Sequence, residues 1–262
     1  MLLNLPDIHK IYKKGPLNWF MNLNFMGKNV VITGGSRGIG EASARLFSEA
    51  EAKVVVLDLE QPKDKNVEFY KCDVSKIEEV RKAAEKIKKV DVLVNNAGII
   101  LVNEFLEQDE KDWSKIIDTN VLGVFNCSKI FGEKMKTNGG KIVNVVSTHA
   151  FPKKNNDSEL GTENAIVYAA SKGAIATFTK ALALELAKYN INVNGICPTL
   201  TKTEMTKEIL DEISEEFYKK KLPLNRINEA EDVANAILFL SSEKARNITG
   251  QLINVDAGYL LK

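Results

Sequence analysis

Tyr168 and Lys172 are the two residues in this 262-residue chain whose types and spacing most directly suggest chemistry. They lie early in an alanine-rich stretch that predicts a helix from about residue 165 to 188, where a separation of four positions puts both side chains on one face. A phenol titrates at about pH 10 in water and is a poor base at neutral pH. A neighbouring ammonium favours the phenolate and lowers its pKa, so the pair predicts a proton-transfer site.

A glycine-rich octet, TGGSRGIG at residues 33–40, forms the second candidate group. It follows the strand-like run NVVIT and leads into a predicted helix. The first turn of a helix presents unpaired N–H groups and the positive end of its dipole, and glycines let a phosphate approach the backbone. The octet therefore predicts a cradle for a dinucleotide pyrophosphate, with the candidate residues Gly34, Ser36, Arg37, Gly38, Ile39 and Gly40.

Two side chains bear on which dinucleotide is bound. Asp58 ends the next strand-like run, 24 residues after Gly34. A carboxylate there accepts both hydroxyls of an adenosine ribose and repels a 2′-phosphate. Arg37 lies within the octet and is able to pair with such a phosphate. Because Asp58 is better placed, we interpret the cofactor as NAD and keep NADP as the less favoured alternative.

Short β-branched runs alternate with helical stretches from residue 28 onward. Several runs are apolar at successive positions, which is typical of strands buried on both faces of a parallel sheet. The pattern predicts an α/β fold class: a single-domain Rossmann fold with a doubly wound parallel sheet of about seven strands and helices on both faces. We assign residues 27–262 to this catalytic domain and residues 1–26 to an N-terminal extension. The predicted strands are 29–33, 53–58, 67–72, 90–95, 141–147, 191–197 and 251–256.

Composition excludes several classes of protein. The 36 basic and 35 acidic residues balance, and no block of like charges suggests a nucleic-acid partner. No run approaches the roughly 18 apolar residues of a membrane span. The three cysteines, Cys72, Cys127 and Cys197, share no C-x-x-C spacing and predict reduced thiols in a cytoplasmic protein. We therefore expect neither a metal site nor a membrane role.

The ordered motifs resemble those of the short-chain dehydrogenase/reductase family, in its shorter single-domain branch. The glycine octet and YAASK are joined, in the family's order, by other segments that together cover residues 28–260. These segments are NNAG at 95–98, DTNVLG at 118–123, VVST at 145–148, CPTLTKTEM at 197–205, PLNRINEAEDVA at 223–234 and ITGQLINVDAG at 248–258.

This resemblance implies a catalytic role for four residues. Tyr168 would be the general acid/base that exchanges a proton with the substrate oxygen. Lys172 would lower the pKa of Tyr168 and hold the nicotinamide ribose. Ser147 would hydrogen-bond the carbonyl or alkoxide and stabilise the charge that develops there. Asn120 would hold a water that links Lys172 to solvent.

The resemblance also implies cofactor contacts. Asp73 would contact the adenine amino group, and Val74 would supply a backbone amide. Thr203 would hold the nicotinamide carboxamide, with Pro198 and Thr199 beside it. The adenosine ribose would lie against Asn95, Ala97 and Gly98, although Thr33 and Asn95 have an equally good interpretation as ties between strands and loops.

The chain departs from the family pattern at two places. Thr199 follows Pro198 where the family usually has glycine, which adds a side chain beside the expected nicotinamide site. Twenty-one positions separate Ser147 from Tyr168, where roughly a dozen is usual, and the extra polar residues within 152–164 suggest a rim or flap over the pocket. Within this stretch His149 has two interpretations, a substrate contact or an ordinary loop histidine.

The segment 199–226 is a candidate substrate loop. Met205, Ile209, Ile213 and Phe217 recur at helical spacing, either as a core-facing stripe or as the apolar face of a lid that excludes water from the substrate.

We predict an oxidoreductase that transfers a hydride between NAD(H) and a secondary alcohol or ketone. A sugar 1-dehydrogenase and a 3-oxoacyl thioester reductase remain alternatives, and a non-enzymatic NAD sensor is a fourth. The small side chains of the helix at 169–187, together with the resemblance, imply a homotetramer or homodimer.

Overall fold

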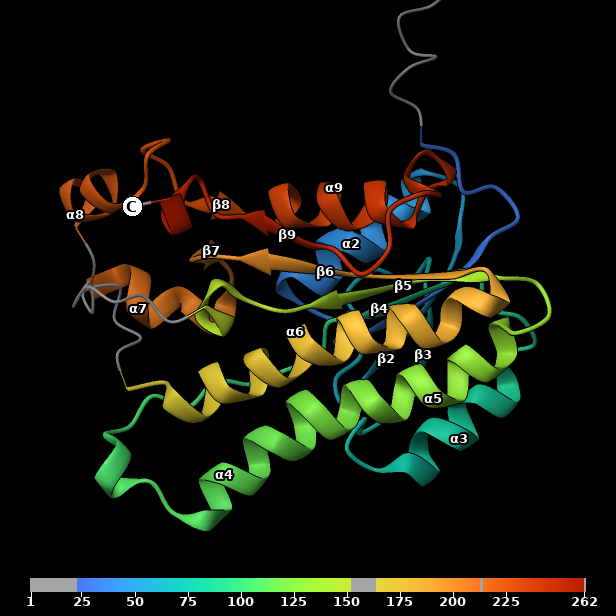
Figure 1. The fold of residues 1–262 in the computed structure, drawn as a ribbon, viewed down its shortest axis with the longest axis horizontal. Coiled ribbons are helices and arrows are strands. Elements are labelled where there is room, and N and C mark those ends of the chain that lie inside the picture. The colour runs from blue at the N-terminus through green and yellow to red at the C-terminus, as the bar shows by residue number, and fades with distance from the viewer. Residues whose placement is uncertain (1–22, 152–163, 213, 262) are drawn as a thin grey trace, which may run out of the picture.

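The computed structural model describes residues 23–151, 164–212 and 214–261. Seven parallel strands form one sheet in the order β3-β2-β1-β4-β5-β6-β9, with a pair of short strands, β7 and β8, beside it (Figure 1). The predicted fold class and all seven predicted strands are confirmed. The large sheet contains β1 (Asn29–Thr33), β2 (Lys53–Asp58), β3 (Glu68–Lys71), β4 (Val92–Asn95), β5 (Gly140–Val145), β6 (Ile191–Pro198) and β9 (Leu252–Val255).

Helices cover both faces of the sheet. In Figure 1, α2 (Gly38–Glu49) and α9 (Ala230–Ser241) lie on one face. On the other face lie α3 (Ile77–Lys86), α5 (Gly123–Met135) and α6 (Ile166–Leu186), with α4 (Glu110–Ile117) leading into α5. This is the doubly wound arrangement expected of alternating strands and helices.

Burial on both faces of the sheet explains why several strands are apolar at successive positions. Val30 and Ile32 of β1 pack with Phe47 of α2 in one core cluster, whereas Val31 packs with Phe131 of α5 in the other. Successive side chains of a strand point to opposite faces, and here both faces are covered. A buried strand therefore shows a continuous apolar run instead of an alternating one.

The strand order reverses between β1 and β4. From β1 the chain proceeds to β2 and β3 on one side, and from β4 it proceeds to β5, β6 and β9 on the other. The connections after β1 and β4 consequently diverge at the carboxyl edge of the sheet, which opens the crevice where ligands bind in folds of this type.

A buried polar chain links the sheet to α5 and α6. Asn95 Nδ2 donates to Ser128 Oγ at 3.0 Å and to Asn144 Oδ1 at 2.8 Å, and Asn144 Nδ2 donates to Thr179 Oγ1 at 2.9 Å. All four side chains are buried. Because buried polar groups are costly without partners, this chain fixes α6 against the ends of β4 and β5.

The start of α3 differs from the sequence expectation. The run SKIE at 75–78 predicts a capping box between Ser75 and Glu78. Ser75 instead donates its N–H and its hydroxyl to Asp73 Oδ1, at 3.0 and 2.6 Å. The helix begins only at Ile77, and its N-cap residue makes no side-chain cap bond. Two hydrogen bonds to a charged carboxylate are stronger than the single cap bond that Ser75 would accept from the helix. Ser75 therefore bonds to Asp73 and does not cap α3.

The candidate substrate loop is built from short elements. It contains β7 (Thr201–Lys202), α7 (Lys207–Glu212) and α8 (Glu215–Lys221), and β7 pairs with β8 (Asn228–Glu229). Ile209 packs against a small core around Leu222, as the core interpretation predicted. Met205 is 48% exposed and lines the crevice instead, and Ile213 lies outside the described residues.

Two of the segments named in the sequence analysis lie outside the described residues. The extension before residue 23 and the insertion at 152–163 are not described. In the parts of the chain that are described, no helix combines the length and apolar character needed to cross a bilayer, and no group of three or more potential metal ligands occurs.

Candidate active site

The first turns of α6 place Tyr168 and Lys172 on one side of the helix, as the spacing predicted. The ammonium Nζ of Lys172 lies 5.4 Å from the centroid of the Tyr168 ring. Lys172 is only 4% exposed, and its Nζ donates to the carbonyl oxygen of Val145 at 2.8 Å. The last residue of β5 thus provides the hydrogen-bond acceptor for this buried ammonium.

Ser147 follows β5 directly and faces the same pair. It caps a short 3-10 turn, Thr148–Ala150, and its side chain is buried. A hydrogen bond with Ser147 favours the phenolate of Tyr168 and lowers the pKa of that phenol. The structure therefore brings Ser147, Tyr168 and Lys172 together.

Asn120 reaches this cluster from a π-helical segment, Asp118–Leu122, between α4 and α5. Its Oδ1 accepts the Ile99 N–H at 2.8 Å, and its Nδ2 donates to the Ile99 carbonyl at 2.9 Å and to Ser171 Oγ at 3.1 Å. A Cβ on Gly98 would lie 3.2 Å from Asn120 Oδ1 and 3.7 Å from Lys172 Nζ. Irregular helical turns of this kind often occur at functional sites, and this one brings the asparagine to the loop after β4.

Burial, not the neighbouring ammonium, dominates the pKa of Tyr168. Burial raises it to about 12, with the hydrogen bond from Ser147 acting in the opposite direction. Burial also lowers the pKa of Lys172 to about 8. Desolvation thus outweighs the hydrogen bond at Tyr168, and the expectation that Lys172 lowers the pKa of Tyr168 stays a prediction.

A groove runs along the carboxyl edge of the sheet from Asp58 to this cluster. Its outer part has a volume of about 490 Å³ and its inner part about 110 Å³. Five residues line both parts: Ile39, Asn96, Gly98, Thr203 and Met205. The predicted residues that line the outer part are Gly34, Arg37, Gly38, Ile39, Asp58, Asp73, Val74, Ala97, Gly98 and Thr203, and those that line the inner part are Ile39, Gly98, Ser147, Tyr168, Lys172, Pro198, Thr199 and Thr203.

Two residues of the octet, Ser36 and Gly40, shape the groove without lining it, and their contacts with the cofactor stay predictions. The Ser36 N–H donates to Asp58 Oδ2 at 2.9 Å, which ties the loop to the end of β2. Gly34 has a φ of +64°, and a Cβ on Gly40 would lie 2.0 Å from the Gly34 carbonyl oxygen. Only glycine fits at position 40, and the loop closes tightly over the start of α2.

Asn95 does not line the groove. Its side chain points to the α5 and α6 side of the sheet and enters the buried polar chain. These bonds support the interpretation of Asn95 as a structural tie, and its contact with the cofactor stays a prediction. Its neighbour Asn96, which was not singled out, lines the groove and donates from Nδ2 to the Gly34 carbonyl at 2.7 Å.

Thr33 is also a tie. Its Oγ1 accepts the N–H of Asn96 at 3.0 Å and the N–H of Ala97 at 3.1 Å. The same oxygen donates to the Val94 carbonyl at 3.4 Å. Thr33 thereby joins the carboxyl ends of β1 and β4 below the groove.

Charges at the outer end of the groove are mostly negative. Asp58 Oδ1 accepts the Glu60 N–H at 3.2 Å, so both oxygens of the Asp58 carboxylate are oriented by the backbone. The guanidinium of Arg37 lies 4.0 Å from Glu60 Oε1, and both side chains are exposed. An ion pair of this kind is weak, and the arginine already faces a carboxylate.

His149 is not an ordinary loop histidine. Its ring packs edge-to-face on Tyr168, with centroids 5.5 Å apart and an interplanar angle of 75°. Its backbone N–H donates to Ser147 Oγ at 3.2 Å, and its Nδ1 lies 3.1 Å from the same oxygen. Sequence spacing alone did not show that the 3-10 turn folds this ring back over Ser147.

Thr199 occupies the family's glycine position without backbone strain. Among the described residues, those with positive φ other than glycine are Glu51, Asn190, Asn225 and Ala257, so Thr199 is not one of them. Its N–H donates to the Val255 carbonyl at 3.2 Å, and its side chain is buried. The added side chain is therefore accommodated at the inner end of the groove.

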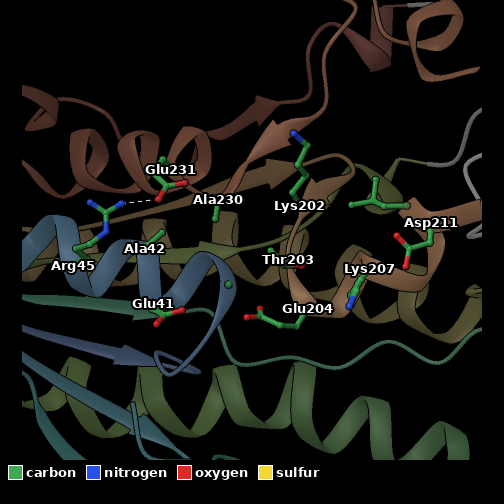
Figure 2. A pocket seen from close by; sticks show the side chains of 12 residues that line it. Glu41, Ala42, Arg45, Lys202, Thr203, Glu204, Lys207, Asp211, Ala230 and Glu231 are labelled. Carbon is green, nitrogen blue, oxygen red and sulfur yellow. Dashed lines mark hydrogen bonds and ion pairs between the residues drawn. The ribbon is translucent and has the colours of Figure 1, made fainter. Parts of the chain in front are cut away.

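A second hollow of about 550 Å³ lies behind the glycine loop, between α2, α7 and the start of α9 (Figure 2). Gly38, Thr203 and Glu204 line both this hollow and the groove. Arg45 bridges its far wall through an ion pair with Glu231, at 2.6 Å. Its remaining lining carries charges of both signs, which favours no single class of ligand.

Comparison with known proteins agrees with this geometry. A family model described as enoyl-(acyl carrier protein) reductase matches residues 34–260. The chain belongs to this family, a branch of the short-chain dehydrogenases/reductases, and is an oxidoreductase that acts on CH–OH groups.

Individual relatives differ in substrate and cofactor. An NAD-dependent glycerol dehydrogenase from Listeria innocua is 38% identical over 92% of this chain and 97% of its own length. A 3-oxoacyl-[acyl-carrier-protein] reductase from Chlamydia pneumoniae is 36% identical over 91% of this chain and 99% of its own. The ligand-free aldohexose dehydrogenase of Thermoplasma acidophilum has a TM-score of 0.82 and 30% identity, covering 92% of this chain and 96% of that one. Other solved neighbours are complexes with NADP or with NADH.

The buried ammonium of Lys172 should lower the stability of the folded protein at neutral pH. Burial lowers its pKa from 10.5 to about 8, which corresponds to about 3 kcal/mol. Because the folded state binds fewer protons than the unfolded state between these values, the free energy of unfolding should rise from pH 8 to 10.5. Lys172→Met should raise it by up to about 3 kcal/mol at pH 7 and weaken that pH dependence, as measured by urea denaturation.

Lys180→Met is the matched control, because Lys180 lies on the same helix and is exposed. It should leave the free energy of unfolding and its pH dependence nearly unchanged. A Lys172→Met protein less stable than the wild type at pH 7 would contradict the prediction.

Proposed function

We propose that the protein transfers a hydride between NAD(H) and a secondary alcohol or ketone. The observation that supports this most is the convergence of Ser147, Tyr168 and Lys172 at the inner end of a groove whose outer end is Asp58. The groove has space for a dinucleotide, and the close approach of Gly40 to Gly34 leaves backbone, not side chain, at the start of α2. When bound there, the nicotinamide would supply or accept the hydride.

The four polar residues at the inner end then have separate roles. Tyr168 exchanges the proton at the reacting oxygen, and Ser147 donates a hydrogen bond to that oxygen. Lys172 holds the nicotinamide ribose, and Asn120, which lies beside it, supports a path for protons to solvent. The nicotinamide ring of the oxidised cofactor would carry a positive charge beside Tyr168, which favours the phenolate and opposes the effect of burial.

We propose cofactor contacts for the predicted residues that line the groove. The predicted residues that only tie the loop to the strand ends are left out of the contacts. Asp58 receives the adenosine ribose, Asp73 and Val74 receive the adenine, and Thr203 receives the carboxamide. Ser36, Gly40 and Asn95 hold the loop and strand ends in place. The remaining proposed contacts are Gly34, Arg37, Gly38, Ile39, Ala97, Gly98, Tyr168, Lys172, Pro198 and Thr199.

NAD is the proposed cofactor, in preference to NADP. Asp58 lines the outer end of the groove, and Glu60 lies beside it and faces Arg37. These two carboxylates would repel a 2′-phosphate at that end. The glycerol dehydrogenase relative uses NAD, whereas several structural neighbours hold NADP. The negative charge around Asp58 supports NAD for this protein.

The substrate is proposed to be a small secondary alcohol or ketone, with polyols and sugars included. Relatives act on glycerol and on aldohexoses, and the inner cavity of about 110 Å³ is small. A 3-oxoacyl thioester is the second candidate, favoured by the family description and by Met205 and Ile99, which add apolar wall. A sensor without turnover would use Lys172 only to hold the nicotinamide ribose and would not need the hydroxyls of Ser147 and Tyr168.

The domain division and assembly are also proposals. Residues 27–262 form the catalytic domain, with the substrate loop at 199–226 and an extension at 1–26. Leu184 is 83% exposed on α6 and Phe125 is 42% exposed on α5, which supports a homodimer or homotetramer. Three buried, unpaired cysteines support a cytoplasmic location.

Tyr168→Phe tests the proposed chemistry. Loss of the hydroxyl should lower kcat by about 10²–10⁴-fold and leave the Kd for NADH nearly unchanged, because the ring and its packing remain. NADH oxidation and NAD reduction should be followed by absorbance over polyols, sugars, ketones and acyl thioesters. Retention of more than a tenth of the wild-type kcat would contradict the assigned role.

Asp58→Asn tests the cofactor choice. An amide oxygen at this position still accepts the Ser36 N–H, but the charge that repels a 2′-phosphate is lost. The ratio of kcat/KM for NADH to that for NADPH should fall about 10–100-fold, the equivalent of about 1.5–3 kcal/mol. Glu60→Gln, at an exposed neighbour, should change the ratio less, and an unchanged ratio in Asp58→Asn would argue against NAD selection by this residue.

The proposed assembly is tested by size-exclusion chromatography with light scattering, which measures the molar mass of the eluted protein. A homodimer or homotetramer should have two or four times the 29.1 kDa of one chain. Leu184→Glu should lower that mass if α6 contributes to the interface, because a buried unpaired carboxylate is costly. A wild-type protein that elutes as a monomer at micromolar concentration would contradict the proposal.

A further inference from the structure

The hydroxyl of Ser147 has a limited set of hydrogen-bonding positions. A serine oxygen donates one hydrogen bond and accepts two. The backbone N–H of His149, 3.2 Å away, occupies one acceptor position. This leaves one proton and one lone pair for the two remaining neighbours, which are His149 Nδ1 at 3.1 Å and the phenol of Tyr168.

The tautomer of His149 decides where that proton goes. If Nδ1 carries a proton, it donates to Ser147 Oγ, fills the second acceptor position and leaves the serine proton directed at the reaction site. If Nδ1 is bare, the serine must donate to it, and the reaction site loses its donor. The two tautomers thus have opposite consequences for a residue whose proposed role is to donate to the reacting oxygen.

The surroundings hold the imidazole neutral and in place. Burial lowers the pKa of His149, and the ammonium of Lys172 lowers it further. The ring is fixed by its edge-to-face contact with Tyr168 and by the 3-10 turn that carries it. Among the described residues, the ammonium of Lys172 acts on the pKa of the imidazole and the ring of Tyr168 packs against it. The neutral imidazole is therefore the form that meets Ser147 at neutral pH.

We propose that His149, as its neutral Nδ1–H tautomer, is a positioning residue that fixes the Ser147 hydroxyl as a hydrogen-bond donor toward the reacting oxygen. This rests on the proposed function for the role of Ser147, but the tautomer itself is a property of the resting protein. His149 acts through Ser147 and not on the substrate, so it should affect kcat more than KM.

The tautomer can be read without any turnover. The chain has two histidines, His9 and His149, so a ¹⁵N-histidine-labelled full-length protein gives two ring systems in long-range ¹H–¹⁵N spectra. A His9→Gln variant assigns them. We expect Nδ1 of His149 to be the protonated nitrogen and Nε2 the bare one from pH 6.5 to 8, and a protonated Nε2 with a bare Nδ1 would overturn the proposal.

Two variants test the consequence for catalysis. His149→Asn keeps an N–H close to the position of Nδ1–H and should retain kcat within about threefold. His149→Leu has a similar size but no donor, and should lower kcat about 10-fold, the equivalent of one hydrogen bond, with KM for the alcohol and Kd for NADH changed less than about threefold.

Other outcomes identify other roles. A rise in KM without a fall in kcat in His149→Leu would mean that the ring contacts substrate, and an equal loss in the Asn and Leu variants would mean that only its shape matters. Either result overturns the proposal. Absence of wild-type turnover on every substrate tested would count against the proposed function, while the spectra of the resting protein would still decide the tautomer.

Discussion

The hydroxyl of Thr33 is the contact on which the site depends. Where the strand order reverses, the segment after β4 leaves the sheet, and the N–H groups of Asn96 and Ala97 have no strand partner. Thr33 accepts both, and the amide of Asn96 returns a bond to the carbonyl of Gly34. Because unpaired buried N–H groups are costly, these contacts hold the glycine loop and the β4 loop at a fixed separation. The groove is the space between them.

The inner end of the groove depends on a different kind of constraint. An ammonium has been buried and given a main-chain carbonyl as partner, while a π-helical turn brings an asparagine close to it. Burial shifts the pKa of Lys172 and that of Tyr168 in opposite directions, each toward the neutral form.

Much of this arrangement could be predicted from sequence. The seven strands follow from β-branched runs, and the Tyr168–Lys172 face follows from helical periodicity. Asn95 lies two residues from Leu93 on β4, so strand alternation puts both on the α5 and α6 side of the sheet and already favours the interpretation of Asn95 as a tie. The start of α3 and the location of His149 depend on hydrogen bonds within tight turns, and the pKa of Tyr168 depends on burial. None of these three is encoded in residue spacing.

The predicted loss of stability caused by burying the Lys172 ammonium also affects how the sequence changes in evolution. Random substitution by an apolar residue at this position relieves the burial of a charge, so mutational drift favours loss of the lysine. Only selection for cofactor binding and turnover opposes that drift. A lineage that gave up both would lose the lysine early, so the lysine marks a position kept for the cofactor and its chemistry.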